Sequence, residues 1–163
     1  MSSIVLLDTS VYLNILSIPG YSQSRDEVLQ EFGQRIEDGD HFLLPLACVW
    51  ETGNHIADLS DGRQRRGFGQ KLVDDVTNAF EGNLPYRATH FPEREEFLKW
   101  LGDFPDVVMR NKSEEKLREG VSLADHSLIK EWERNCELHP LRRVCIWSLD
   151  SDLQGYDLVP MER

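Results

Sequence analysis

Two aspartates closely follow apolar runs that have the length of buried strands. Asp8 ends the run at Ile4–Leu7, and Asp150 comes shortly after the run at Val144–Trp147. A short, unbroken apolar run is typical of a strand that is buried on both faces of a parallel sheet. Because parallel strands joined by helices end at the same sheet edge, we expect both carboxylates at the edge where α/β proteins bind ligands.

A third acid, Asp125, is predicted to lie on the buried face of a helix. It stands four residues after Val121, three before Leu128 and four before Ile129, and these spacings share one side of a helix. A lone buried carboxylate is costly unless it is paired with a base or bound to a metal. The pattern leaves two interpretations open, a salt bridge to an arginine and a functional site.

A fourth acid, Glu51, follows the predicted strand at residues 41–45 and starts near the same sheet edge. It flanks the apolar face of the next predicted helix, four residues after Ala47. Taken alone, Glu51 is better explained as a solvated acid at a helix start, where the helix dipole favours negative charge. Glu51 is a candidate site residue because the three other acids could lie close to it.

Four carboxylates brought together without a cation would repel one another and raise one another's pKa values. Mg²⁺ or Mn²⁺ relieves this repulsion, because both ions suit oxygen ligands and accept water in the remaining positions. Such an ion can activate bound water and stabilise charge on a phosphate oxygen, so phosphodiester hydrolysis is the chemistry that fits best. The sequence contains no G-x-S-x-G, no phosphate-binding glycine loop and no H-E-x-x-H, which disfavours other hydrolytic sites.

These acids would be positioned by strands that alternate with helices. The apolar patterns predict strands over residues 4–7, 41–45, 86–91, 144–147 and 156–160, and helices over 9–16, 25–37, 46–59, 63–80, 93–101 and 122–135. Thr9 or Ser10 is predicted to cap the first helix, and Ser122 the last. The alternation predicts an α/β fold, a three-layer α/β/α sandwich around a central parallel sheet of four to five strands.

The composition bounds the class of protein. At 163 residues the chain is expected to form one domain. Its net charge of −11 disfavours binding of nucleic acid by the whole surface but leaves room for a local basic groove. No apolar run reaches the roughly 20 residues that span a membrane, and no secretory signal is visible. The cysteines, Cys48, Cys136 and Cys145, lack C-x-x-C spacing and are predicted to be free thiols in a reducing cytoplasm.

The acids and the residues around them together resemble the PIN-domain family of metal-dependent ribonucleases, especially the VapC-like toxins. Ile-Val-Leu-Leu-Asp-Thr-Ser-Val resembles the family's first strand and first acid, Asp8, and Leu-Pro-Leu-Ala-Cys-Val-Trp-Glu its second strand and second acid, Glu51. Ser-Leu-Ala-Asp-His-Ser-Leu-Ile resembles the helix with the third acid, Asp125. Val-Cys-Ile-Trp-Ser-Leu-Asp-Ser-Asp-Leu resembles the fourth strand and its T-x-D-x-D/H-type ending, with the fourth acid at Asp150 and an auxiliary acid at Asp152.

The resemblance implies a single PIN-like domain over residues 1–163, with the sheet order 3-2-1-4-5. It implies endonucleolytic cleavage of single-stranded RNA with Mg²⁺ or Mn²⁺ bound at the acids. The metal ligands would be Asp8, Glu51, Asp125, Asp150 and, as an auxiliary, Asp152. Ser148, with Thr9 or Ser10, would hold ligand carboxylates by hydrogen bonds. The partners that the resemblance suggests are a second copy of the chain and a small antitoxin protein, although residues 60–87 and 103–119 make the chain longer than a compact toxin.

Some residues outside the acid set allow both a functional and a structural interpretation. Arg63, Arg65 and Arg66 could guide an RNA backbone, although a solvated helix face is the favoured explanation for such a charge run. Lys112 belongs to a polar stretch and is predicted to be exposed. The four tryptophans fall on apolar faces and are predicted to lie in the core; they are Trp50, Trp100, Trp132 and Trp147.

A second hypothesis is a binding module that keeps the same fold and acts through protein contacts, with weak or no catalysis. The acidic surface and the two long insertions motivate this hypothesis. The presence of all four acids argues against it, because a degenerate site has no reason to keep them.

Overall fold

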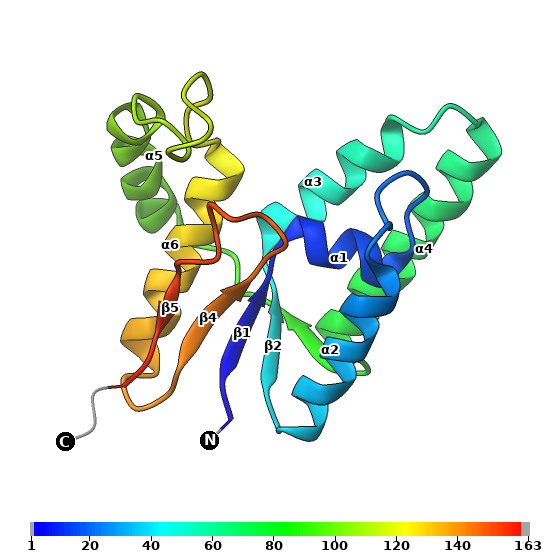
Figure 1. The fold of residues 1–163 in the computed structure, drawn as a ribbon, viewed down its shortest axis with the longest axis horizontal. Coiled ribbons are helices and arrows are strands. Elements are labelled where there is room, and N and C mark those ends of the chain that lie inside the picture. The colour runs from blue at the N-terminus through cyan, green and yellow to red at the C-terminus, as the bar shows by residue number, and fades with distance from the viewer. Residues whose placement is uncertain (1, 161–163) are drawn as a thin grey trace.

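The computed structural model describes residues 2–160 and shows a five-stranded sheet flanked by helices (Figure 1). The strands are β1 (Ile4–Leu7), β2 (His41–Leu44), β3 (Tyr86–Ala88), β4 (Val144–Trp147) and β5 (Asp157–Leu158). Their order is β3-β2-β1-β4-β5, which confirms the predicted α/β fold and strand order. Residue 1 and residues 161–163, the ends of the predicted domain 1–163, lie outside the described residues.

The first four strands are parallel, but β5 pairs antiparallel to β4. The sheet is therefore mostly parallel, and the predicted parallel arrangement holds for β1 to β4 but not for β5. Residues 148–156, which connect β4 to β5, contain only bends and turns. A parallel connection needs a crossover, usually a helix, so this short connection can return the chain only in the antiparallel direction.

The six helices within the described residues are α1 (Thr9–Leu16), α2 (Arg25–Glu37), α3 (Leu46–Ala57), α4 (Gly62–Glu81), α5 (Arg94–Val108) and α6 (Leu123–Leu138). Helices α1 to α4 contribute to the core on one face of the sheet, and α6 packs on the other face. Helix α5 packs against α6, on the outer side of the molecule (Figure 1). No helix within residues 2–160 has both the length and the apolar character needed to cross a bilayer.

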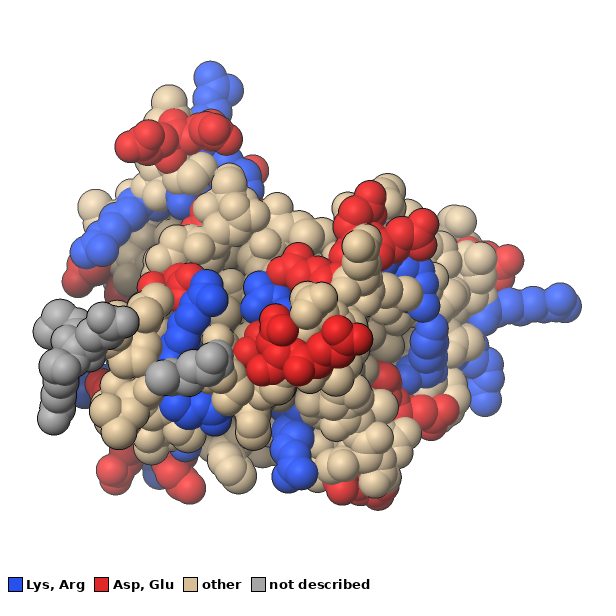
Figure 2. All heavy atoms as spheres, turned by 60° about the horizontal axis from the view of Figure 1, so that its bottom comes forward, with Lys and Arg blue, Asp and Glu red and all other residues tan. Residues whose placement is uncertain are grey.

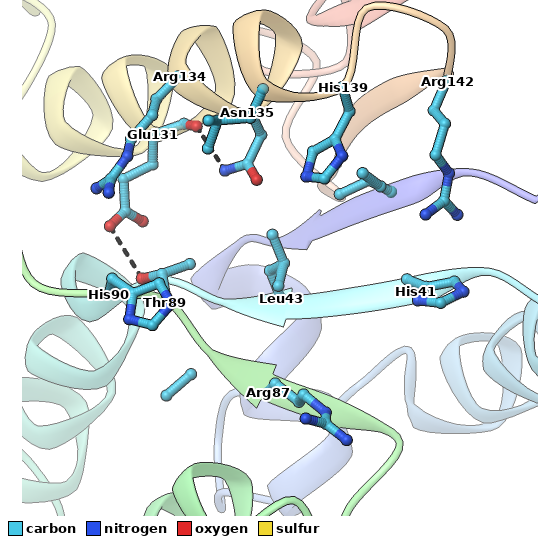
Figure 3. Close-up of a pocket in the computed structure, with 13 residues that line it drawn as sticks. His41, Leu43, Arg87, Thr89, His90, Glu131, Arg134, Asn135, His139 and Arg142 are labelled. Carbon is cyan, nitrogen blue, oxygen red and sulfur yellow. Dashed lines mark hydrogen bonds between the residues drawn. The ribbon is translucent and has the colours of Figure 1, made fainter.

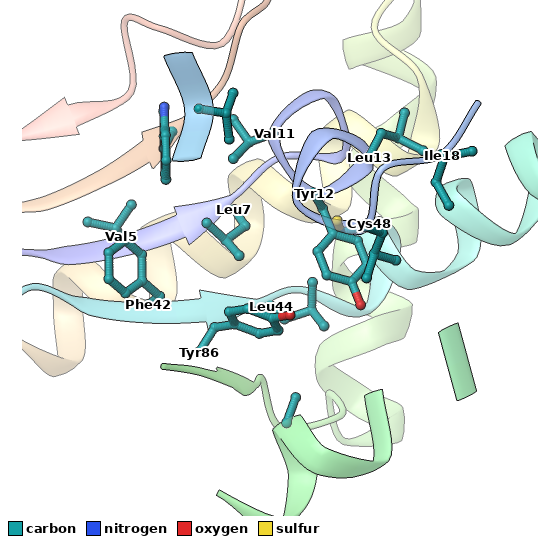
Figure 4. Close-up of a cluster of buried hydrophobic side chains, with 14 of the residues drawn as sticks. Val5, Leu7, Val11, Tyr12, Leu13, Ile18, Phe42, Leu44, Cys48 and Tyr86 are labelled. Carbon is teal, nitrogen blue, oxygen red and sulfur yellow. The ribbon is translucent and has the colours of Figure 1, made fainter. Parts of the chain in front are cut away.

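Strand β1 contributes to both cores because alternate side chains point to opposite faces. Val5 and Leu7 pack in the larger cluster beside Tyr12 and Phe42 (Figure 4), while Leu6 packs against α6 with Leu128 in the smaller cluster. All four residues of β1 are buried. This two-sided burial explains why the strand appears in the sequence as a continuous apolar run rather than an alternating one.

Helix α5 continues beyond its predicted end at residue 101 and includes Pro105. The predicted polar segment 103–119 is therefore helical in its first part. Proline normally disfavours a helix interior, but the ring of Phe104 lies 5.9 Å from the ring of His126 on α6 and extends the helix–helix contact. Packing against α6 offsets the local cost of the proline, so the helix extends past the predicted end at residue 101.

The prediction that all four tryptophans lie in the core was wrong for Trp50. Trp100 and Trp147 are buried and Trp132 is partly buried, whereas 65% of Trp50 is exposed. The buried residues of α3, Cys48, Thr52 and Ile56, recur every four positions. Trp50 stands two residues from Cys48 and Thr52, which in a helix is about half a turn away from their stripe.

A cavity of about 350 Å³ lies between α6 and the part of the sheet formed by β2 and β3 (Figure 3). Glu131 of α6 extends into this region, where one carboxylate oxygen accepts a hydrogen bond of 2.9 Å from the Thr89 hydroxyl. Its other oxygen has no hydrogen-bond partner among the described residues, and burial raises the pKa of Glu131 to about 7. None of the predicted metal ligands lines this cavity.

Candidate metal centre

Asp8 occupies the junction between β1 and α1, and its carboxylate is held by two hydroxyl groups. Oδ2 accepts hydrogen bonds from Ser10 Oγ at 2.7 Å and from Ser148 Oγ at 2.8 Å. Asp8, rather than Thr9 or Ser10, is the N-cap of α1, and its side chain accepts from the Ser10 backbone N–H. The predicted cap was wrong because Asp8 itself keeps the extended backbone that an N-cap requires.

The surroundings of Asp8 do not favour its charge. Burial raises the pKa of Asp8, the hydroxyl groups of Ser10 and Ser148 oppose that rise, and the nearby charge of Asp150 adds to it. Ser148 also accepts a hydrogen bond of 2.9 Å from the Asp150 backbone N–H, so one hydroxyl connects the ends of β1 and β4. The two acids that follow the apolar strands therefore lie at one edge of the sheet.

Glu51 lies in the first half of α3, soon after β2, and it is partly buried. Its pKa is raised to about 7, first by burial and then by the charges of Asp125 and Asp8. Helix α3 packs against α1, which Asp8 caps, and against α6, which carries Asp125, in agreement with the effect of these two charges on Glu51. The helix-start interpretation of Glu51 alone accounts for its position but not for this effect.

Asp125 is buried in the first turn of α6, as the apolar pattern indicated. Its backbone N–H donates to the hydroxyl of the N-cap residue Ser122, which confirms the predicted cap. Its Oδ2 lies 3.1 Å from the Nζ atom of Lys112. Asp125 therefore has a basic partner, but this partner is a lysine rather than the arginine considered from the sequence.

Asp152 follows Asp150 in the turns after β4 and has a nearly buried side chain. Its Oδ1 lies 3.2 Å from Lys116 Nζ, and its Oδ2 lies 3.8 Å from Lys112 Nζ. Burial lowers the pKa of Lys112, but Asp125, Asp152 and Asp150 outweigh it and hold the pKa above its ordinary value. Lys112 thus faces acids from two separate segments of the chain.

The residue types at this edge fit a hard divalent cation. The donors are carboxylate oxygens, and the pKa of Glu51 is raised first by burial and then by the charges of Asp125 and Asp8. A divalent cation would relieve the part that comes from these neighbouring charges. The spacing is less complete, because residues 2–160 contain no group of three or more His, Cys, Asp or Glu close enough to hold a metal ion. In this structure the carboxylates share their surroundings with a lysine and do not form a closed set of ligands.

The arginines predicted to guide RNA are not placed at these acids. Arg63, Arg65 and Arg66 lie on the first turn of α4, which begins at the outer end of α3, away from the sheet (Figure 1). The guanidinium group of Arg65 donates to the carbonyl oxygen of Leu59 at 2.8 Å and so supports the loop before α4. The sequence indicated this solvated-face alternative for the cluster.

The basic residues that do reach the acids, Lys112 and Lys116, were not selected from the sequence. Lys112 was predicted to be exposed, yet its side chain is only 20% exposed. Residues 109–121 form neither a helix nor a regular strand, so the spacing of apolar residues could not predict where these side chains lie. The sequence indicated their proximity to Asp125 only by placing them shortly before the helix that contains it.

A groove of about 370 Å³ lies between α3, α5 and α6 and includes Glu51 in its wall. Its lining is mainly apolar, with the exposed side chains of Trp50, Phe97 and Leu123. Exposed apolar surface of this kind is typical of a contact with a partner. The groove adjoins the carboxylates on the α3 side of the site.

No family model matches this chain, and no curated protein or solved structure matches it either.

Proposed function

We propose that this chain is a Mg²⁺- or Mn²⁺-dependent endoribonuclease of the PIN type that hydrolyses phosphodiester bonds in single-stranded RNA. The observation that carries the proposal is the gathering of acids from separate segments: Ser148 bonds both the Asp8 carboxylate and the Asp150 backbone N–H, and Lys112 lies between Asp125 and Asp152. Asp8 and Asp150 follow β1 and β4, and Glu51 lies early in the helix after β2, at the sheet edge where α/β folds bind ligands.

The proposal assigns a role to each acid. Asp8, Glu51, Asp125 and Asp150 would hold the ion, and Asp152 would assist by a second ion or by orienting water. When bound, the divalent cation supplies an activated water molecule and stabilises negative charge on the phosphate. Ser10 and Ser148 orient the Asp8 carboxylate through their hydrogen bonds.

The cellular compartment and the partners of the protein are also part of the proposal. The three cysteines are free thiols in the structure, which suits a reducing cytoplasm. The apolar groove beside Glu51 suits a protein partner. A small antitoxin protein or a second copy of the chain would be such a partner if the nuclease is the toxin of a pair.

The alternative is a PIN-like binding module with weak or no catalysis. One observation favours it: Lys112 and Lys116 neutralise Asp125 and Asp152, so the acids are partly satisfied without a metal. The charges of Asp125 and Asp8 argue against it: after burial they are the next causes of the raised pKa of Glu51, so the lysines leave part of the carboxylate repulsion unrelieved.

The deciding experiment incubates the purified protein with end-labelled single-stranded RNA and Mn²⁺. EDTA and the Asp125→Asn variant are the negative controls. Asp103→Asn is a matched control, because Asp103 also pairs with a lysine, at 3.5 Å, but lies on α5 among exposed residues.

We expect cleavage by the wild type and by Asp103→Asn, and loss of cleavage with EDTA or Asp125→Asn. Full activity of Asp125→Asn would defeat the assignment of this residue. Absence of both cleavage and Mn²⁺ binding in the wild type would favour the binding module.

A further inference from the structure

Residues 109–121, which connect α5 to α6, form a loop that is closed at its base. Asn111 and Gly120 form an antiparallel bridge, and the Lys112 backbone N–H donates to the Glu119 carbonyl oxygen at 2.7 Å. Only glycine fits at position 120, because a Cβ atom there would lie 2.2 Å from the carbonyl oxygen of Val108. The loop thus starts and ends at fixed points rather than hanging freely from the two helices.

The closed loop directs two lysine side chains toward the carboxylates of the candidate metal centre. Lys112 Nζ lies 3.1 Å from Asp125 and 3.8 Å from Asp152, and Lys116 Nζ lies 3.2 Å from Asp152. Both ammonium groups flank the single carboxylate of Asp152, so they can reach neighbouring phosphates of one bound RNA strand. The Lys116 backbone N–H donates to Ser113 Oγ at 3.1 Å, which fixes the turn that carries the second lysine.

These contacts raise a question of charge balance once a divalent cation is bound. A cation bound at the proposed ligands, which include Asp125 with Asp152 assisting, would compete with the lysines for these two carboxylates. The two ammonium groups would then lose their partners while they remain beside the reacting centre. A phosphate group is the natural replacement, because lysine binds phosphate as a compact point charge.

We propose that Lys112 and Lys116 contact the phosphates of the RNA substrate and exchange their carboxylate partners for phosphates when the metal binds. This inference rests on the proposed function and identifies the chain's own groups that hold the substrate backbone. It also explains how a protein of net charge −11 retains an anionic substrate without a broad basic surface. Substrate binding and metal binding are then coupled through the same pair of side chains.

The test measures binding of a short fluorescein-labelled oligouridylate by fluorescence anisotropy over a range of NaCl concentrations. Ca²⁺, which also prefers oxygen ligands, replaces Mn²⁺, and a gel confirms that the RNA stays intact. The variants are Lys112→Met and Lys116→Met. Lys130→Met is the matched control, because Lys130 also pairs with two acids, Glu133 at 3.1 Å and Asp103 at 3.5 Å.

Each of the two loop variants is expected to bind the RNA about fivefold more weakly at low salt. The slope of log affinity against log salt should also become shallower by about 0.7 for each lysine removed. The Lys130→Met control should bind as the wild type does. A salt slope that stays unchanged in Lys112→Met and Lys116→Met would overturn the assignment, since lysines that serve only as counterions would give that result.

A calorimetric titration with Mn²⁺ and no RNA separates this inference from the proposed function. Lys112→Met should bind Mn²⁺ more tightly than the wild type, because the variant lacks the ammonium group that competes for Asp125. If the wild type shows no Mn²⁺ binding that Asp8→Asn removes, the metal centre itself is wrong, and the metal-coupled exchange fails with it. If Mn²⁺ binding is intact but the salt slopes do not change, the lysine assignment alone is wrong.

Discussion

The two ends of the parallel sheet use the same residue types in opposite ways. At the amino ends of the strands, Asp157 and Asp40 each have a basic partner. Arg143 donates two hydrogen bonds to Asp157, at 2.8 and 2.6 Å, and Asp40 accepts from the Ser3 backbone N–H at 2.7 Å and pairs with Arg35 at 3.5 Å. Figure 2, which brings this end of the molecule forward, shows basic side chains beside acidic ones.

At the carboxyl ends the acids outnumber their bases. Asp8 accepts hydrogen bonds from hydroxyl groups, and no salt bridge within the described residues involves Asp8 or Glu51. The direction of the pKa shift separates the two ends: Arg143 lowers the pKa of Asp157, whereas burial and neighbouring acids raise that of Glu51 to about 7. Acids paired within the protein stabilise the fold, while acids left in excess have capacity for an outside cation.

The largest expected difference between the two ends is in catalysis. Asp8→Asn should reduce RNA cleavage by at least about 100-fold, because it removes a charged ligand from the site. The fold should be retained, since asparagine also caps helices well. Asp157→Asn, the matched change at the amino end, should leave cleavage unchanged. Cleavage rates and circular dichroism of both variants check this, and equal losses of activity would erase the distinction between the ends.

Metal binding should distinguish the ends in a stability measurement that needs no substrate. Mn²⁺ at about 100 times its Kd should stabilise the wild type by about 2.7 kcal/mol, and Asp157→Asn by the same amount. Asp8→Asn should lose most of this stabilisation. Thermal unfolding with and without Mn²⁺ provides the measurement. An equal Mn²⁺ effect in Asp8→Asn would place the bound ion elsewhere on the acidic surface.

The raised pKa of Glu51 predicts a pH dependence of stability in the absence of metal. Between its ordinary pKa of 4.5 and the folded value of about 7, the folded protein binds more protons at this site than the unfolded chain does. The contribution of Glu51 to stability therefore falls as pH rises through this window. Glu51 faces Asp8, Asp125 and Lys112, and saturating Mn²⁺ should remove most of the effect.

Glu51→Gln is the variant that isolates this contribution. The buried Glu131 titrates in the same range, so the quantity to compare is the wild type minus the variant, with Glu131 present in both. Denaturant unfolding from pH 5 to pH 8 gives the two stability curves. A constant difference between them across this range would contradict the raised pKa of Glu51.

The smallest effect is expected at the amino end. Arg143→Ala should cost about 1 kcal/mol or less, because the Arg143–Asp157 pair is partly exposed and exposed pairs contribute little. Mn²⁺ affinity and RNA cleavage should not change. Chemical denaturation and a Mn²⁺ titration of the same sample check both statements. A change in Mn²⁺ affinity would show that the two ends are coupled.

The sequence by itself determined the fold and the places where its acids stand along the chain. Strands buried on both faces require continuous apolar runs, so Ile4–Leu7 and Val144–Trp147 were recognisable without any tertiary information. The alternation of these strands with helices predicted the α/β class, and the resemblance to the PIN family implied the strand order that the structure shows. The buried position of Asp125 followed from helical spacing, since one face of a helix repeats every three to four residues.

Only the tertiary structure decided which charges meet. The loop with Lys112 and Lys116 has no period of its own, and its closure at Gly120 brings these side chains to acids on α6 and after β4. Trp50 is exposed because the neighbours of α3 cover only the stripe of Cys48 and Thr52, which local hydrophobicity cannot reveal. Local patterns determine which residues are buried within one element. Contacts between distant segments depend on how the elements pack, and the candidate site is made of such contacts.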